Sequence, residues 1–135
     1  MVTIVTRAGK GSPLTNTEMD ANFQNLDDGK LELIVRGTTS TATISPACSD
    51  SQYNVTALAV DASIEAPSGT PQAGQKFLLR IKDNGTVRSL SWNAIYRGIN
   101  LTLPTTTTAG KTTYIGCIYN ATDSKWDVTA VVTEA

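Results

Sequence analysis

The sequence contains no histidine and only two cysteines among its 135 residues. Histidine is the commonest general base and the commonest metal ligand, so its absence removes the usual catalytic triads and most zinc sites. Cys48 and Cys117 are too far apart in the chain to form a CxxC unit, and we expect both to be buried thiols. Glycine-rich phosphate-binding motifs are also absent. The sequence therefore predicts no metal site and no cofactor.

Clustered charge and long hydrophobic runs are missing as well. The 11 basic and 12 acidic residues give a net charge of −1, and the basic residues are scattered, which argues against a nucleic-acid partner. The apolar runs fall far short of the roughly 20 residues that span a bilayer. The first residues lack the apolar core of a secretion signal. We expect a product made in a cytosol, with no membrane partner.

Paired carboxylates are the one enzymatic arrangement that remains to be considered. Asp83 and Asp123 lie in predicted turns, where aspartate is favoured for backbone reasons. Asp61 and Glu65 flank a short predicted strand, and Asp127 is expected to point outward. Nothing in this pattern indicates a cleft with a perturbed acidic pair, so we predict no catalytic residues and no enzymatic activity.

One helix is predicted, over about residues 16–28. Thr15 and Glu18 have the spacing of a capping box, and Pro13 prevents extension toward the N-terminus. Met19, Phe23 and Leu26 follow in steps of four and three, which is the spacing of a coiled-coil seam. Two interpretations stay open: the stripe packs against symmetry-related copies, or it covers an edge of the chain's own β domain. The predicted oligomer or docking interface consists of Leu14, Met19, Phe23 and Leu26.

From residue 31 onward the pattern is that of short β-strands separated by Thr, Ser, Pro and Gly clusters. Hairpin turns are predicted at residues 83–85 and 120–125. Seven or eight short strands without an internal repeat predict a mainly β fold, a β-sandwich or jelly-roll-like domain with one short N-terminal α-helix. The predicted division is an N-terminal docking segment, residues 1–30, and a β-sandwich knob, residues 31–135.

The aromatic residues allow a second kind of site. Trp92 and Trp126 lie on predicted strands, where core packing is the expected role. Tyr96 lies beyond a strand end and is predicted to be exposed. Tyr96 and Trp92 are therefore the candidates for a sugar-stacking surface.

Two segments resemble proteins of tailed bacteriophages. Residues 10–26, KGSPLTNTEMDANFQNL, are similar to a segment near the N-terminus of tail-fibre and virion-appendage proteins. Residues 74–132, with IKDNG, LSWN, LPTT and YNATDSKWD, look like a β domain common in phage fibre proteins. The resemblance implies a virion protein made in the bacterial host cytoplasm, with an N-terminal junction and an outward, trimeric β knob.

The chain departs from that family in one respect, because only about residues 31–52 lie where long fibres have a shaft. The leading hypothesis is a short fibre-like appendage that docks to tail or baseplate proteins. A capsid decoration (cement) protein that stabilises the phage head is the alternative. A carbohydrate-binding receptor module, with a host surface glycan as its ligand, is a further alternative.

Overall fold

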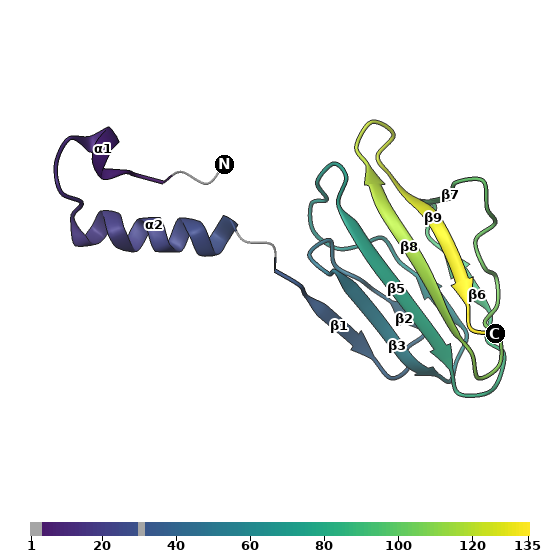
Figure 1. Ribbon diagram of the computed structural model, residues 1–135. Helices are drawn as coiled ribbons and strands as arrows, with labels where there is room; N and C mark the ends of the chain where they lie inside the picture. Colours follow the sequence, from purple (N-terminus) through teal and green to yellow (C-terminus); the bar gives the residue numbers. More distant parts are fainter. Residues whose placement is uncertain (1–3, 30–31) are drawn as a thin grey trace. The chain divides into compact units, whose positions relative to one another are not determined.

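The computed structural model describes residues 4–29 and 32–135, and it divides the chain into two compact units, Met1–Glu32 and Leu33–Ala135. Residues 1–3, 30 and 31, which belong to the predicted docking segment and to the start of the predicted knob, lie outside the described residues. The N-terminal unit contains α1 (Arg7–Lys10) and α2 (Asn16–Gly29) (Figure 1). The predicted helix over 16–28 is confirmed, whereas the short α1 was not predicted.

Within the described residues, the second unit has nine strands in two sheets (Figure 1). The larger sheet has the strand order β1-β3-β5-β8-β9-β7, and the smaller has the order β2-β4-β6. The strands are β1 (Val35–Thr38), β2 (Thr43–Ile44), β3 (Gln52–Leu58), β4 (Ala62–Ile64), β5 (Lys76–Asp83), β6 (Leu90–Trp92), β7 (Tyr96–Gly98), β8 (Thr112–Asn120) and β9 (Lys125–Thr133).

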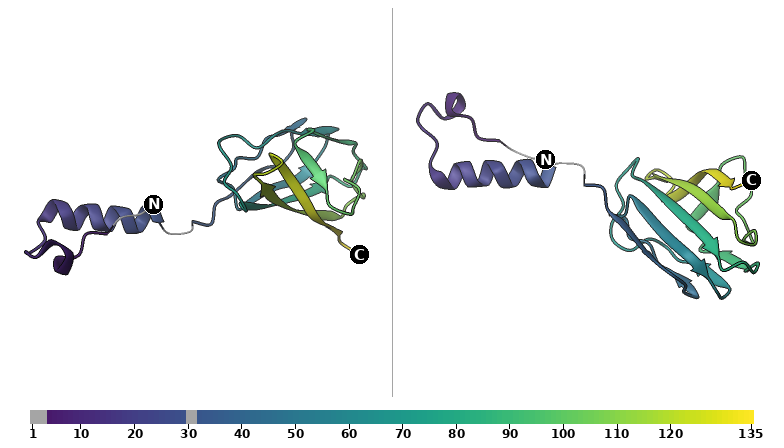
Figure 2. Two further views of the ribbon diagram at one scale, coloured as in Figure 1. Left: turned by 90° about the horizontal axis from the view of Figure 1, so that it is seen from above. Right: turned by 60° about the horizontal axis from the view of Figure 1, so that its bottom comes forward.

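From β1 to β6 the chain alternates between the two sheets, so that each sheet receives every second strand (Figure 2). The pairs β1–β3, β3–β5, β2–β4 and β4–β6 are consequently parallel. The hairpin β8–β9 adds antiparallel strands beside β5, and β7 pairs with β9 in parallel. The mainly β prediction is confirmed. The arrangement is not a clear jelly roll, because a jelly roll is built from antiparallel strands.

The predicted hairpin at residues 83–85 is wrong. β5 pairs with β3 and β8, while β6 belongs to the other sheet and pairs with β4. Gly85, at a φ of 95°, turns the chain from one sheet toward the other. The carboxylate of Asp83 accepts hydrogen bonds from Gly85 N at 2.9 Å, Gly110 N at 2.6 Å and Thr107 Oγ1 at 2.5 Å. The predicted hairpin at residues 120–125 is confirmed.

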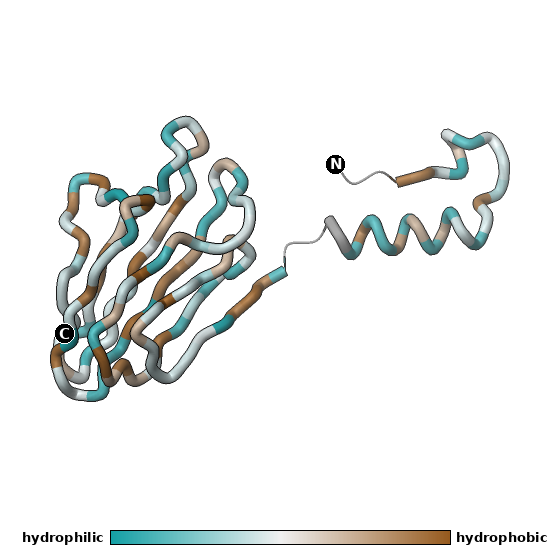
Figure 3. The backbone as a smooth tube through the Cα atoms, turned by 180° about the vertical axis from the view of Figure 1, so that it is seen from behind, coloured by the Kyte–Doolittle hydropathy of each residue, from teal (hydrophilic) through white to brown (hydrophobic). Residues whose placement is uncertain are grey.

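Buried residues from both sheets form one hydrophobic core. Hydrophobic stretches alternate with hydrophilic ones along the strands, whereas α2 is mostly hydrophilic (Figure 3). Trp126 is fully buried, and its ring contacts those of Phe77 and Tyr119 at centroid distances of 4.9 and 5.3 Å. Both cysteines are buried and free, as predicted. Burial raises the pKa of Cys117 to about 12, which keeps its thiol protonated and unreactive.

Gly37 in β1 is required by a close approach of two backbones. A Cβ atom added there would lie 2.3 Å from the carbonyl oxygen of Asn54 on β3. We expect Gly37→Ala to displace β1 and to lower the free energy of unfolding by about 1–3 kcal/mol, the usual cost of overpacking. Urea unfolding followed by tryptophan fluorescence measures this loss.

Gly116→Ala is the matched control, because it adds the same methyl group within another strand of the same sheet. The nearest atom to that methyl group is the Cβ of Ala130 at 3.7 Å, an ordinary contact. We expect a change within about 0.5 kcal/mol for this variant. Equal destabilisation by the two substitutions would contradict the close-approach explanation.

Candidate functional site

The candidate site is the apolar row on α2, formed by Met19, Phe23 and Leu26. Their exposed fractions are 41, 70 and 58 %. Spacings of four and three residues place the three side chains on one face of the helix. No side chain in residues 4–27 is buried. The N-terminal unit thus has no hydrophobic core within these residues, and no other described residue of this unit buries the apolar row.

Leu14 precedes α2 and is half-buried. It lies immediately before the helix cap and not in the row. Three of the four predicted interface residues therefore share one face of α2, and the fourth, Leu14, precedes the helix. Sequence spacing identified the row because a single regular helix carries it.

A second apolar segment, which sequence analysis did not connect with the row, lies alongside α2. The strap, residues 4–6, runs next to the helix within the N-terminal unit (Figures 1 and 2). Asn22 holds it with both ends of its side-chain amide: Val5 N donates to Asn22 Oδ1 and Asn22 Nδ2 donates to Val5 O, each at 2.8 Å. Ile4 and Val5 are 42 and 38 % exposed. The strap therefore adds apolar surface beside the helix.

The start of α2 has the predicted capping box. Glu18 N donates to Thr15 Oγ1 at 3.2 Å, and Thr15 N donates to Glu18 Oε2 at 2.7 Å. Lys10 Nζ also donates to Glu18 Oε2, which joins the last residue of α1 to the cap of α2. These contacts lower the pKa of the Glu18 carboxyl to about 2. The hydrogen bond from Lys10 has the largest effect, and those from Thr15 come next.

The cap gives a pH-dependent prediction for the N-terminal unit. Because the Glu18 pKa falls from about 4.5 on folding, its ionised cap is fully favourable above pH 4.5 and is lost as the pH falls toward 2. We expect the NMR shift of the Thr15 amide to titrate with a midpoint near 2, and to lose this titration in Glu18→Gln. A midpoint near 4.5 would show that the Lys10 and Thr15 contacts are not formed in solution.

The predicted exposure of Tyr96 is wrong, since only 5 % of the residue is accessible. Its hydroxyl donates to the backbone oxygen of Glu65 at 3.0 Å, and its ring packs edge-on against Trp92 at 5.2 Å. Trp92 is half-buried against the core, and its Nε1 donates to Pro104 O at 2.7 Å. Burial raises the pKa of Tyr96. The two rings form a packing pair and not an exposed stacking surface, because Tyr96 begins β7, pairs with Trp126 of β9 and belongs to the hydrophobic core.

The carboxylates examined as catalytic candidates occupy structural positions. Asp127 was expected to point outward, yet it is buried and accepts from Arg97 Nε at 2.8 Å. Arg97 also donates to Asp123 at 2.9 Å. Sequence analysis missed the pair of Arg36 with the buried Asp50, a bidentate contact at 2.5 and 2.8 Å. Such fork-shaped pairs fix loops and strands. Asp123 and Asp127 are brought together because both accept hydrogen bonds from Arg97 and from Asn120 Nδ2, the latter at 3.2 and 3.3 Å.

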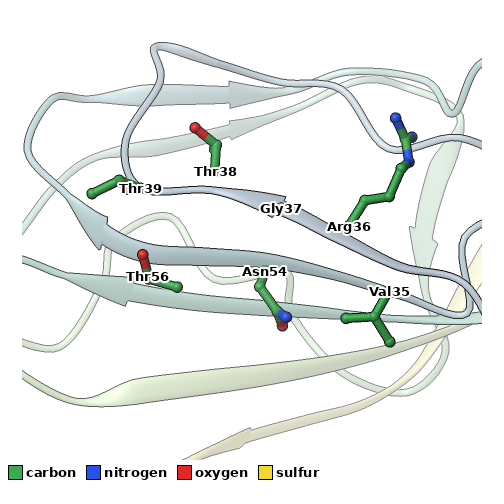
Figure 4. A pocket seen from close by; sticks show the side chains of 7 residues that line it. All are labelled: Val35, Arg36, Gly37, Thr38, Thr39, Asn54 and Thr56. Atoms are coloured by element: carbon green, nitrogen blue, oxygen red, sulfur yellow. The ribbon is translucent and has the colours of Figure 1, made fainter.

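A shallow groove of about 370 Å³ follows the outer edge of the larger sheet. The groove residues, drawn in Figure 4, are Val35, Arg36, Gly37, Thr38, Thr39, Asn54 and Thr56. Arg36 is the one titratable group among them, and its guanidinium is held by Asp50. Figure 4 shows its side chain leaving β1 on the opposite side from Val35. The groove therefore lacks an acid–base pair.

Comparison with known proteins gives no identification. No protein-family model, curated protein or solved structure matches the chain. Within residues 4–29 and 32–135, no three His, Cys, Asp or Glu side chains gather in a way that would hold a metal ion. No helix in the same part of the chain is long and apolar enough to cross a membrane.

Proposed function

We propose that this chain is a non-enzymatic structural protein of a tailed-phage virion, a short fibre-like appendage. The N-terminal unit docks to the particle and joins three copies, and the β unit is the displayed knob. The observation that carries the proposal is the exposed apolar row of Met19, Phe23 and Leu26 on a unit without a buried side chain in residues 4–27. The resemblance of residues 10–26 and 74–132 to phage fibre proteins supports the same assignment.

The energetics of the N-terminal unit favour assembly. An isolated helix of 14 residues is only marginally stable in water, and α2 gains no support from a core of its own. Burying three large side chains contributes roughly 1.5–3 kcal/mol for each one that is fully covered. Apolar side chains at heptad spacing pack against the same side chains of another helix, so further copies of this chain bury the row.

The β unit supports a displayed, non-catalytic role. Its acidic side chains at Asp50, Asp83 and Asp127 are used in hydrogen bonds and ion pairs that fix the fold. Its two cysteines are buried. The hydrophobic core of the β unit stabilises its fold, so the unit needs no bound ligand to stay folded when it projects from an assembly.

Electron microscopy of phage particles that carry this chain, labelled with an antibody to the β unit, tests the proposal. Label at the tail or baseplate is the expected result. Label spread over the head would favour the capsid decoration protein instead. Particles without label, in preparations where the antibody recognises the purified chain, would contradict a virion role.

A further inference from the structure

The apolar row of α2 has two chemically different flanks. In heptad notation Phe23 takes position a, and Met19 and Leu26 take position d. Asn22 then takes position g on one flank, and it holds the strap there through its two hydrogen bonds to Val5. Asp20 takes position e on the opposite flank, and the next e position, seven residues on, is also acidic. One flank is thus apolar and the other acidic.

Beside its apolar surface, the strap flank has one cation without an ion-pair partner among the described residues, Arg7. Val5 is held at the level of Asn22, and Lys10 contacts Glu18 near the helix start. Arg7, at the start of α1, follows the strap and lies between these two contacts in the chain. Arg7 makes no ion pair with any residue that the structure describes, which leaves its guanidinium available to a neighbour.

Different flanks determine how copies fit together. In parallel helices, side chains at position g of one copy meet side chains at position e of the next copy. That arrangement sets the strap and Arg7 of one copy against the acidic flank of its neighbour, which includes Asp20. An antiparallel pair would instead set like flanks together. Contacts between unlike surfaces close into a ring when the rotation between copies closes, as it does in a trimer.

From this geometry we infer that the strap is part of the assembly interface, with the acidic flank of a second, parallel copy as its partner. Asn22 is the positioning residue that holds the strap at this interface. The inference rests on the proposed trimer and explains how so short a helix gains enough contact area to maintain it. The composite surface consists of Ile4, Val5, Met19, Phe23 and Leu26, with Arg7 at its edge.

Sedimentation equilibrium of the full-length chain tests the role of Asn22. We expect Asn22→Ala to raise the midpoint concentration for trimer dissociation about tenfold, because it releases the strap from the interface. Thr17→Ala is the matched control: it also replaces a polar side chain on α2 by alanine, on the side of the helix away from Asn22 and the strap, and it should stay within about twofold of the wild type. In hydrogen exchange, the Val5 amide should lose protection only in Asn22→Ala.

Charge reversal tests the neighbour contact. Arg7→Glu and Asp20→Arg should each weaken the trimer about three- to fivefold, and the double variant should return to within about twofold of the wild type. Absence of recovery in the double variant would overturn the parallel flank contact. A wild-type trimer unaffected by Asn22→Ala would overturn the strap's role while leaving the trimer intact. A monomeric wild type would overturn both this inference and the proposed assembly.

Discussion

Phe23→Asp should convert the proposed trimer into monomers. At the a position of a three-copy seam, the substitution brings three carboxylates into one apolar layer, and burying an ion without a partner costs several kcal/mol. We expect the association constant to fall by at least about 100-fold, which corresponds to about 2.7 kcal/mol. Light scattering at micromolar concentration should give three times the 14.3 kDa chain mass for the wild type and a single chain mass for the variant.

Ala21→Asp is the matched control for this experiment. It introduces the same charge into the same helix, at a position on the face opposite Phe23. The trimer mass should persist in this variant. The β unit should keep its circular dichroism spectrum in both variants, because its core includes no residue of α2. A trimer that survives Phe23→Asp would remove the apolar row from the assembly interface.

Trp126→Ala should cause the largest loss of stability in the β unit. The ring is fully buried and contacts Phe77 and Tyr119, so its removal leaves a cavity between the sheets. Replacement of a buried tryptophan by alanine typically lowers the free energy of unfolding by about 3–5 kcal/mol. That is a large part of the about 5–15 kcal/mol that stabilises a domain. Chemical denaturation followed by far-ultraviolet circular dichroism measures the change.

Val132→Ala provides the comparison on the same strand, β9. The Val132 side chain is 62 % exposed, and we expect its truncation to change stability by no more than about 0.5 kcal/mol. A Trp126→Ala variant that unfolds at the same denaturant concentration as Val132→Ala would show that the ring does not anchor the core.

The N-terminal helix was predictable because all of its signals are local. The Thr15 and Glu18 cap and the spacing of Met19, Phe23 and Leu26 lie within a dozen residues, and the cap contacts form among those residues. The strap was not predictable. A single asparagine amide that binds the backbone of Val5, 17 residues away, has no distinctive sequence pattern.

Strand pairing was the part of the fold that sequence reasoning could not establish. Alternation of apolar and polar residues along β5 and β6 indicates strands with one buried face, but it is the same for parallel and antiparallel partners. The turn at Gly85 was correctly located. It does not close a hairpin, because β6 joins the smaller sheet beside β4 instead of pairing with β5. Tyr96 and Asp127 were misplaced for the same reason, because β7 and β9 pair with each other in parallel.

The position of β1 has a mechanical consequence. It is one of the two edge strands of the larger sheet, pairs with β3 through four residues only, and is the first strand after the N-terminal unit. Tension between an anchored N-terminal unit and the β unit would therefore enter the fold at an edge strand that is held by only four paired residues. The central strands β5 and β8, paired with each other over seven residues, would bear that tension only after β1 and then β3 had separated from the sheet. The strand that follows the N-terminal unit, β1, could thus separate without disturbing the hydrophobic core, because none of its residues belongs to that core.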